Sequence, residues 1–357
     1  MLVFMLLAAA LVAEAPPGVV IDHEPASARR YIGSPSIAIL KDGSYVASHD
    51  FFGPTSNQST SGVTRIFRSE DRGGTWRRIA ELSDQFWSNL FAHRRALYLM
   101  GSSCEYGRIA IRRSTNGGRT WSDPSFLTVE ANYHTAPVPI ALHKGRVWRA
   151  FEYHPPGPWG HFEALVISTP EKADFLDPRS WTMTPRLPFP AEAPEGKHWL
   201  EGNAIVGPRG ELLDILRVDN VEKAALTRVE AGGLRFEGLV EFPGGAKKFT
   251  IRYDRKSKLY WSLSNPAPGA TNPASVRNTL ALISSPDLRH WQVRKVILAH
   301  SDPARHAFQY ADWQFDGEDL VVVSRTAFDD DEGGAPRGHD ANFLTFHRVK
   351  RFRAGSR

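Results

Sequence analysis

The chain is poor in cysteine and in long hydrophobic segments. Cys104 is the single cysteine of 357 residues, so no disulfide can form within the chain, and an oxidising compartment is permitted but not exploited. The one long apolar run, within residues 1–15, is too short to span a bilayer. The formal charge is +5, but basic residues occur singly or in pairs, whereas nucleic-acid-binding proteins usually concentrate them in one stripe. We therefore expect neither a membrane span nor a nucleic-acid partner.

Motifs for metals and cofactors are lacking as well. No spacing of His, Cys and Asp is typical of a zinc site, no glycine-rich phosphate loop follows an expected strand, and no G-x-S-x-G nucleophile turn occurs. The acidic run 329–332 is expected to be a solvated loop, with a calcium site as the alternative because carboxylates are dense there. We expect no cofactor and no metal.

Residues 1–15 are apolar and end in Ala13-Glu14-Ala15. This segment resembles a secretory signal with an A-x-A cleavage site. No Lys or Arg precedes the apolar run, and a buried N-terminal strand is the alternative. We predict a signal peptide over residues 1–15, a single domain over residues 16–357, and a secreted or periplasmic protein.

Turn-forming residues and tryptophan are abundant, and one turn sequence recurs. The octapeptide 69–76, Ser-Glu-Asp-Arg-Gly-Gly-Thr-Trp, returns as 114–121, Ser-Thr-Asn-Gly-Gly-Arg-Thr-Trp, and a degraded copy lies at 285–291. The Asp or Asn side chain of such a turn folds back onto backbone N–H groups, and glycine takes the position with positive φ. Recurrence at a distance predicts a repeat protein.

A second marker counts the repeats. Six segments each consist of a short β-prone run, a polar or glycine turn and another β-prone run, and no segment shows helical periodicity. The turn centres, near residues 42, 94, 144, 209, 256 and 317, are separated by about 47 to 65 residues, the length of a four-stranded propeller blade with its loops. Trp76, Trp121, Trp181 and Trp291 are expected to mark blade ends, with Phe236 as a degenerate marker.

The repeated turn resembles the Asp-box of the sialidase superfamily. The resemblance implies an all-β fold, a six-bladed β-propeller of four-stranded antiparallel blades. Residues 19–24 are then expected to pair with the last blade and close the ring. The functional residues of a propeller lie where the inner strands converge on the central channel.

Those positions carry a ring of polar residues with both signs of charge, as expected for a site that binds a hydroxylated or anionic sugar. They are Ser34, His49, Asp50, Glu105, His134, Glu152, His154, Glu201, Asn203, Arg217, Asp219, Asn265, Arg277, Tyr310, Asp312 and Arg325. Of these, His134, Asn203, Arg325 and Asp312 are predicted to contact substrate.

The resemblance to sialidases extends to the order of four residues. A Glu opens a blade at Glu201, Arg217 follows the second strand, Arg277 comes about one blade later, and Tyr310 opens the last blade. The resemblance implies that Tyr310 is the nucleophile, that Glu201 accepts its proton, and that Arg217 and Arg277 bind a carboxylate through bidentate guanidinium groups.

The first blade departs from the family pattern. The acid/base carboxylate of the family lies in a loop of this blade, where Asp50 is the nearest candidate and His49 is a rival proton donor. Sialidases begin the blade with Arg-Ile-Pro, whereas this chain has Gly33-Ser34-Pro35, so one arginine of the carboxylate clamp is missing unless Arg29 or Arg30 replaces it. The departure argues against strong binding of sialic acid.

Structural explanations exist for each of these residues. Glu201 and Arg217 would also suit a rim ion pair, Tyr310 a strand-start aromatic, and His134 a core or loop histidine. Three functions stay open. The first is an exported, retaining exo-glycosidase that acts on a terminal, possibly anionic sugar of a glycan or glycoside. The second is a polysaccharide lyase, or other altered enzyme, in which His49 or His134 moves the proton. The third is a propeller that binds glycans without catalysis.

Overall fold

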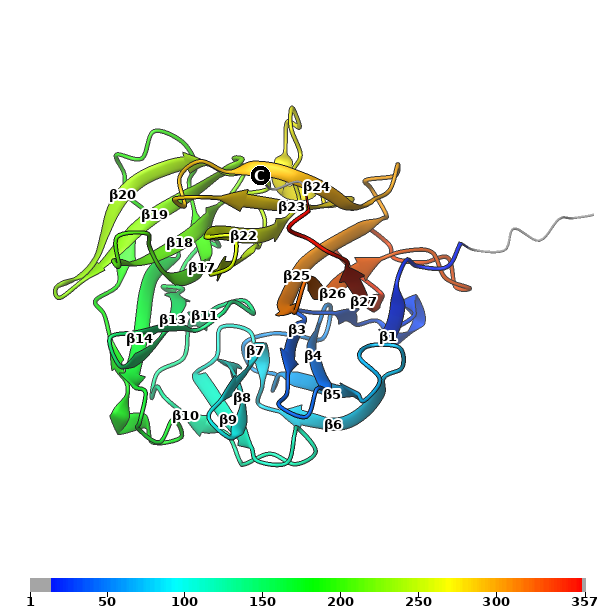
Figure 1. The fold of residues 1–357 in the computed structure, drawn as a ribbon, viewed down its shortest axis with the longest axis horizontal. Helices are drawn as coiled ribbons and strands as arrows, with labels where there is room; N and C mark the ends of the chain where they lie inside the picture. Colours follow the sequence, from blue (N-terminus) through cyan, green and yellow to red (C-terminus); the bar gives the residue numbers. More distant parts are fainter. Residues whose placement is uncertain (1–13, 355–357) are drawn as a thin grey trace, which may run out of the picture.

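The computed structural model describes residues 14–354 and consists of six antiparallel β-sheets that follow one another around a ring (Figure 1). The first 13 residues of the predicted signal peptide lie outside the described residues. Apart from strands, the described chain has three single-turn 3-10 helices, Ala26–Ala28, Pro178–Ser180 and Pro273–Ser275. None of its helices has the length and apolarity needed to cross a membrane.

Each sheet is one blade, and its strands run from the centre of the ring outward in sequence order, except in blade six, where the N-terminal strand is outermost. Blade one contains β3 (Ser36–Ile39), β4 (Tyr45–Phe52), β5 (Val63–Ser69) and β6 (Arg77–Ser83), with β2 (Tyr31–Ile32) beside β4. Blade two contains β7 (Phe86–His93), β8 (Ala96–Ser102), β9 (Ile109–Ser114) and β10 (Ser125–Phe126). Blade three contains β11 (Tyr133–His134), β12 (Ala141–His143), β13 (Arg146–Tyr153), β14 (Glu163–Pro170), β15 (Thr182–Met183) and β16 (Leu187–Pro188).

The second half of the chain repeats this plan. Blade four contains β17 (Trp199–Val206), β18 (Leu212–Val218), β19 (Lys223–Glu230) and β20 (Gly233–Glu241). Blade five contains β21 (Thr250–Asp254), β22 (Leu259–Ser264), β23 (Thr279–Ser285) and β24 (Gln292–Ala299). Blade six contains β25 (Ala307–Asp316), β26 (Asp319–Ala327), β27 (Phe343–Val349) and β1 (Val19–His23).

The predicted hairpins and the predicted closure of the ring are confirmed. All six turn centres join the two innermost strands of a blade: β3 to β4, β7 to β8, β12 to β13, β17 to β18, β21 to β22 and β25 to β26. The N-terminal strand β1 pairs antiparallel with β27, so the two ends of the described chain share blade six (Figure 1). In blades one and three the innermost strand is split in two, where Pro35 and the pair Pro137 and Pro139 interrupt the ladder.

The repeated turn joins the third strand of a blade to the outermost one. In blade one, the Asp71 carboxylate accepts from the backbone N–H of Thr75 (2.9 Å) and from its hydroxyl (2.7 Å), while Gly73 has a φ of +97°. The Trp76 indole N–H donates to the Gly73 carbonyl at 3.2 Å. The tryptophan therefore stands at the start of the outermost strand rather than at its end, and the turn lies on the perimeter, far from the ring's centre.

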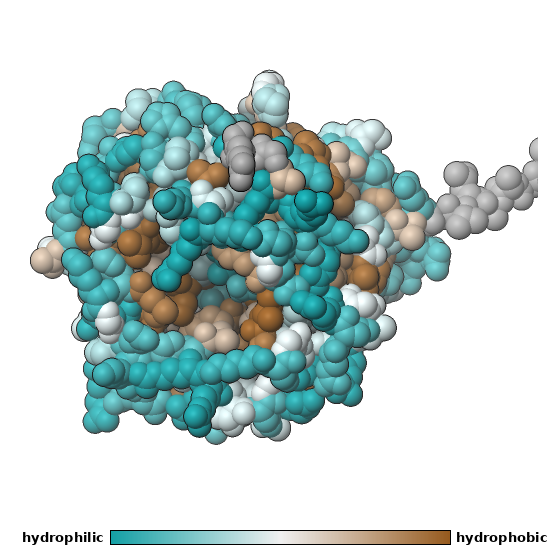
Figure 2. Space-filling model, in the orientation of Figure 1, coloured by the Kyte–Doolittle hydropathy of each residue, from teal (hydrophilic) through white to brown (hydrophobic). Residues whose placement is uncertain are grey.

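Neighbouring blades pack through apolar side chains. Trp261 of β22 and Trp313 of β25 are fully buried in one cluster that joins blades five and six. Figure 2 shows one face of the ring, on which hydrophilic side chains cover most of the rim and hydrophobic side chains gather around the central hollow. The blades thus form a rigid frame, and the strand ends at its centre are held in place for a site.

Candidate active site

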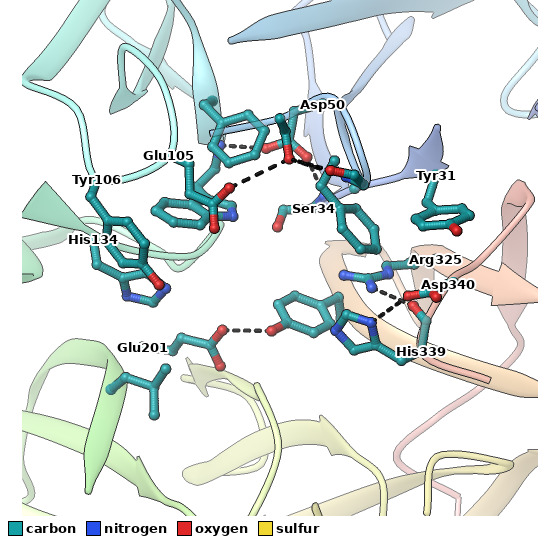
Figure 3. Close-up of a pocket in the computed structure, with 18 of the residues that line it drawn as sticks. Tyr31, Ser34, Asp50, Glu105, Tyr106, His134, Glu201, Arg325, His339 and Asp340 are labelled. Atoms are coloured by element: carbon teal, nitrogen blue, oxygen red, sulfur yellow. Dashed lines mark hydrogen bonds and ion pairs between the residues drawn. The ribbon is translucent and has the colours of Figure 1, made fainter. Parts of the chain in front are cut away.

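A cavity of about 660 Å³ lies where strand ends and loops of the six blades meet (Figure 3). Its lining includes seven of the ten residues predicted for the site, and they come from blades one, three, four, five and six: Asp50, His134, Glu201, Arg217, Arg277, Tyr310 and Arg325. Glu105 of the predicted polar ring also lines the cavity, and the structure adds residues of blade two and of the long loops, among them Trp87, Tyr106, Trp159 and His339.

Three of the cavity residues have a left-handed backbone and lie on β-bulges. Trp87, Glu201 and Tyr310 have φ values of 47°, 59° and 53°, and at each of them the pairing of the two innermost strands shifts register. Such a conformation costs a non-glycine residue about 1–3 kcal/mol. A bulge turns one side chain out of the strand's alternation, and here all three side chains line the cavity.

A buried lysine stabilises the bulge at Tyr310 through hydrogen bonds to its backbone. The Lys248 ammonium donates to the carbonyls of Ala311 (2.9 Å) and Tyr310 (3.4 Å) and to the Thr250 hydroxyl (2.7 Å). Burial lowers the pKa of Lys248 to about 8. These bonds satisfy the bulge carbonyls that the sheet leaves unpaired.

Glu201 and Tyr310 meet in the cavity although 109 residues separate them. The Tyr310 hydroxyl donates to Glu201 Oε1 at 2.7 Å, and Arg217 Nη1 lies 3.0 Å from Glu201 Oε2. Burial opposes ionisation of Glu201, but the charges of Arg217 and His134 outweigh it and lower its pKa. Burial and the Glu201 charge raise the pKa of Tyr310. An ionised carboxylate therefore faces a neutral phenol.

Three guanidinium groups surround this pair. The guanidinium carbons of Arg325 and Arg277 lie 4.8 and 5.7 Å from the centre of the Tyr310 ring. Arg277 donates to the Gln309 side chain (2.7 Å) and the Ala274 carbonyl (3.1 Å), and Arg325 donates to the His339 carbonyl. Within the described residues, Arg277 and Arg325 thus use neutral oxygens and form no contact ion pair, whereas Arg217 is paired with Glu201.

The position of the missing first-blade arginine is occupied by Asp50. A Cβ atom on Gly33 would come within 1.6 Å of Asp50 Oδ1, so only glycine fits beneath this carboxylate. Arg30 does not replace the missing side chain, because it donates to Glu24 at 2.8 and 3.0 Å. The third guanidinium group near Tyr310 comes instead from Arg325 of β26.

Three residues predicted for the site do not line the cavity: His49, Asn203 and Asp312. His49 precedes Asp50 on β4, so strand alternation sends its ring to the other face, where Nε2 bonds the Asp22 carboxylate at 2.8 Å. Their placement corrects the prediction that all polar residues at the inner strand ends face the channel.

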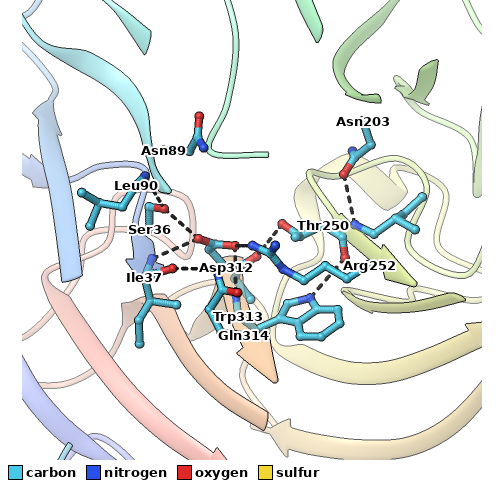
Figure 4. A network of polar contacts seen from close by, with 12 residues as sticks. Ser36, Ile37, Asn89, Leu90, Asn203, Thr250, Arg252, Asp312, Trp313 and Gln314 are labelled. Atoms are coloured by element: carbon cyan, nitrogen blue, oxygen red, sulfur yellow. Dashed lines mark hydrogen bonds and ion pairs between the residues drawn. The ribbon is translucent and has the colours of Figure 1, made fainter. Parts of the chain in front are cut away.

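Asn203 and Asp312 instead tie neighbouring blades together around the axis (Figure 4). Asn203 Oδ1 accepts from the backbone N–H of Ile251 at 3.0 Å. Asp312 accepts from the Ser36 hydroxyl (2.7 Å) and the Ile37 N–H (3.0 Å) and pairs with Arg252 at 3.1 Å. Each follows a bulge residue by two positions, and therefore points at the next blade while the bulge residue points at the cavity.

One wall of the cavity is aromatic, and sequence reasoning missed most of it. The Trp87 ring lies 4.4 Å from the His134 ring and 5.4 Å from the Tyr106 ring, measured between centroids. His134 Nδ1 bonds Glu152 at 2.8 Å, and Trp159 stands at the rim with 52% of its surface exposed. The sequence did contain a pattern that marks Trp87. In the tetrapeptides 86–89, 200–203 and 309–312 the second residue is a large one that lines the cavity, the third is small and the fourth is Asn or Asp.

Sequence comparisons find no relatives. No protein-family profile matches the chain, and no curated protein sequence is detectably similar to it.

Solved structures do match. A sialidase from Trypanosoma rangeli aligns with a TM-score of 0.61 and 14% identity over 96% of this chain and 57% of that chain. An α-L-arabinofuranosidase from Fusarium graminearum aligns with a TM-score of 0.59 and 11% identity over 93% of this chain and 97% of that one. A protein of unknown function from Dyadobacter fermentans aligns with a TM-score of 0.60 and 14% identity over 94% and 100%.

The fold is that of the sialidases. It is the six-bladed propeller that the sequence resemblance predicted, and it is shared with the arabinofuranosidase. At these identities the similarity establishes the sialidase-like propeller fold. The chemistry depends on the residues that line the cavity of this protein.

Proposed function

We propose that the protein is a retaining exo-glycosidase that removes a terminal anionic sugar from a glycan or glycoside, with Tyr310 as the nucleophile. The observation that carries the proposal is the 2.7 Å hydrogen bond from the Tyr310 hydroxyl to Glu201 inside the cavity. A neutral phenol approaches an anionic substrate without repulsion, and the ionised Glu201 accepts the phenolic proton as Tyr310 attacks the anomeric carbon.

The anionic substrate is supported by the arginines. Buried charges are normally paired, yet Arg277 and Arg325 are 7% and 3% exposed, and among the described residues they donate hydrogen bonds only to neutral oxygens. A substrate carboxylate would supply the missing charge and accept bidentate hydrogen bonds. Export stays a prediction that rests on residues 1–15.

The test is turnover of a panel of 4-methylumbelliferyl glycosides. The panel contains N-acetylneuraminic acid, 2-keto-3-deoxynononic acid (KDN), glucuronic acid, galacturonic acid and α-L-arabinofuranose. We expect hydrolysis of at least one anionic glycoside and a loss of about 10³-fold or more in Tyr310→Phe, as for removal of a catalytic nucleophile. Tyr253→Phe, at an exposed tyrosine of β21 outside the cavity, is the control and should keep full activity.

Covalent trapping gives a second readout. After incubation with 2,3-difluoro-KDN, mass spectrometry of the peptides should place the sugar on Tyr310. Full turnover by Tyr310→Phe contradicts the mechanism, and hydrolysis of the arabinofuranoside alone contradicts the anionic substrate.

A lyase is the second candidate, supported by the His134–Glu152 pair at the cavity wall. In that reaction His134 would take a proton from a uronate residue and the arginines would neutralise its carboxylate. His49 bonds Asp22 outside the cavity, so His134→Ala alone should abolish the activity. The products would carry an unsaturated sugar that absorbs in the ultraviolet, which a hydrolase does not form.

A further inference from the structure

A glycosidase needs a proton donor for the leaving group, and five carboxyl groups line the cavity. Besides Glu201, Asp219 pairs with Arg217 and Asp340 pairs with Arg337 and His339, which leaves two candidates without a cationic partner among the described residues. Asp50 follows the family pattern. Glu105 lies in the loop between β8 and β9 of blade two. Both line the cavity, and in Figure 3 both lie on the side away from Glu201. The hydrogen bonds of the two carboxyl groups show which of them can better reach a substrate.

Asp50 is committed to the backbone. Its Oδ1 accepts from the Ser34 N–H at 2.6 Å and its Oδ2 accepts from the Trp87 N–H. The side chain is 1% exposed and packs on Gly33. Burial raises its pKa to about 6 against the effect of these two hydrogen bonds. Asp50 therefore joins blade one to the bulge of blade two, and with 1% of its surface exposed and both oxygens bonded to backbone N–H groups it is less accessible to a substrate than Glu105.

Glu105 is presented to the cavity by a tight turn. The Gly107 N–H donates to the Cys104 carbonyl at 3.0 Å, and Tyr106 has a φ of 54°, so Glu105 and Tyr106 form the tip of a four-residue turn. Among the described residues, the one hydrogen bond to the Glu105 carboxylate comes from the Ser56 hydroxyl and is long, 3.4 Å. Burial raises the pKa of Glu105 more than Ser56 and His134 lower it. The group is half-buried, protonated more readily than an exposed glutamate, and open to the cavity.

Glu105 and the Glu201–Tyr310 pair face the same part of the cavity. All of these residues line one cavity, and in Figure 3 Tyr106 and His134, whose ring centroids are 6.0 Å apart, lie between Glu105 and Glu201. A glycoside whose anomeric carbon contacts Tyr310 can therefore direct its leaving group toward the wall that carries Glu105 and the aromatic side chains.

Resting on the glycosidase proposal, we infer that Glu105 is the acid/base of the reaction. In the first step Tyr310 bonds to the anomeric carbon and passes its proton to Glu201, while the bond to the leaving group breaks and Glu105 gives its proton to that oxygen. In the second step the Glu105 carboxylate takes a proton from water, the water oxygen attacks the anomeric carbon, and Tyr310 leaves and recovers its proton from Glu201. All protons are returned at the end of the cycle.

The test compares leaving groups in Glu105→Gln, whose amide keeps the shape but cannot donate the proton. For the best sugar of the panel, phenyl and 2,4-dinitrophenyl glycosides are measured. We expect kcat/KM to fall about 10²–10⁴-fold for the phenyl glycoside and less than about tenfold for the dinitrophenyl glycoside, which needs no protonation. Azide should rescue the variant and yield the glycosyl azide with retained configuration. Glu241→Gln, at an exposed position of β20, is the control.

The pH profile gives an independent readout. The acid must be protonated, so kcat/KM for the phenyl glycoside falls as pH rises through the pKa of Glu105, and Glu105→Gln should lose this alkaline limb. Asp50, His134, Tyr106 and Glu201 are the other titratable groups that face this part of the cavity. Asp50→Asn should lower the melting temperature and leave the limb in place.

The outcomes separate the two proposals. An equal loss for both leaving groups, or a leaving-group effect in Asp50→Asn instead, overturns the assignment of Glu105 while Tyr310 keeps its role. Full activity of Tyr310→Phe, or no turnover of any glycoside by the wild type, overturns the glycosidase proposal, and the Glu105 assignment falls with it.

Discussion

The two walls of the cavity carry the same residue type in opposite states. On one wall, Glu201 has its pKa lowered, because Arg217 and His134 outweigh the effect of burial. On the other, Glu105 has its pKa raised, because burial outweighs its weak partners. Paired carboxyl groups whose pKa values are pushed apart are the usual arrangement for one base and one acid. The difference teaches that the arginines, rather than the carboxyl groups themselves, set the division of roles.

The two walls are also built differently. On the wall that also carries Arg217, Arg277 and Arg325, Glu201 and Tyr310 stand on bulges of the innermost strands β17 and β25. Lys248 donates to the carbonyls of Tyr310 and Ala311 and so holds the left-handed conformation of Tyr310. The aromatic wall combines one bulge residue, Trp87, with loop residues such as Glu105 and Trp159. Side chains on strands are held precisely, which suits groups that react at the anomeric carbon. Side chains on loops are held less rigidly, which suits contact with leaving groups of different shape.

Replacement of Glu201, the proposed base, should change kcat more than the other substitutions that compare the two walls. We expect Glu201→Gln to lower kcat about 10²–10⁴-fold for phenyl and dinitrophenyl glycosides alike, because attack by Tyr310 needs the base whatever group leaves. Steady-state kinetics on both substrates measure it. A loss confined to the phenyl glycoside would show instead that Glu201 is the proton donor and would reverse the comparison.

Removing an arginine should have a smaller effect, on binding. Arg325→Met should raise KM for a carboxylate-bearing substrate about 10–100-fold, since hydrogen bonds to charged groups contribute about 1.5–3 kcal/mol. The methyl ester of the same substrate should be affected little. Arg209→Met, at an exposed turn outside the cavity, is the control. Equal effects on acid and ester would mean that this wall does not recognise charge.

The smallest change is expected at the rim of the aromatic wall. Trp159→Ala should raise KM for aryl glycosides about two- to tenfold, as expected from loss of an aromatic contact of about 0.5–1.5 kcal/mol. Hydrolysis of the glycosyl fluoride of the same sugar, which has no aromatic leaving group, should keep its kcat. Comparison of aryl glycoside and glycosyl fluoride measures this. A change in KM for the fluoride would place Trp159 at the sugar instead of the leaving group.

Features that depend on residues close together in the sequence were predictable from it, and features that depend on contacts between distant segments were not. The hairpin at residues 208–210 and the turn around Asp71 were predictable, because their hydrogen bonds join residues at most four apart. Asp50 was found in the cavity, but its commitment to the backbone of Trp87, in another blade, leaves no trace in its own segment. His49, Asn203 and Asp312 were misplaced because strand register decides their direction, and one residue of shift reverses a face.

By itself the sequence determined the number of blades, the closing strand and the candidates at the inner strand ends, because turn chemistry and alternation are local properties of the chain. Only the tertiary structure decided which candidates meet. The pairing of Tyr310 with Glu201, 109 residues away, depends on the arrangement of the blades in a ring and on the bulges. The hydrogen bond from the Trp87 N–H to Asp50 depends on the packing of blade two beside blade one. Both contacts join different blades, so no short segment encodes them.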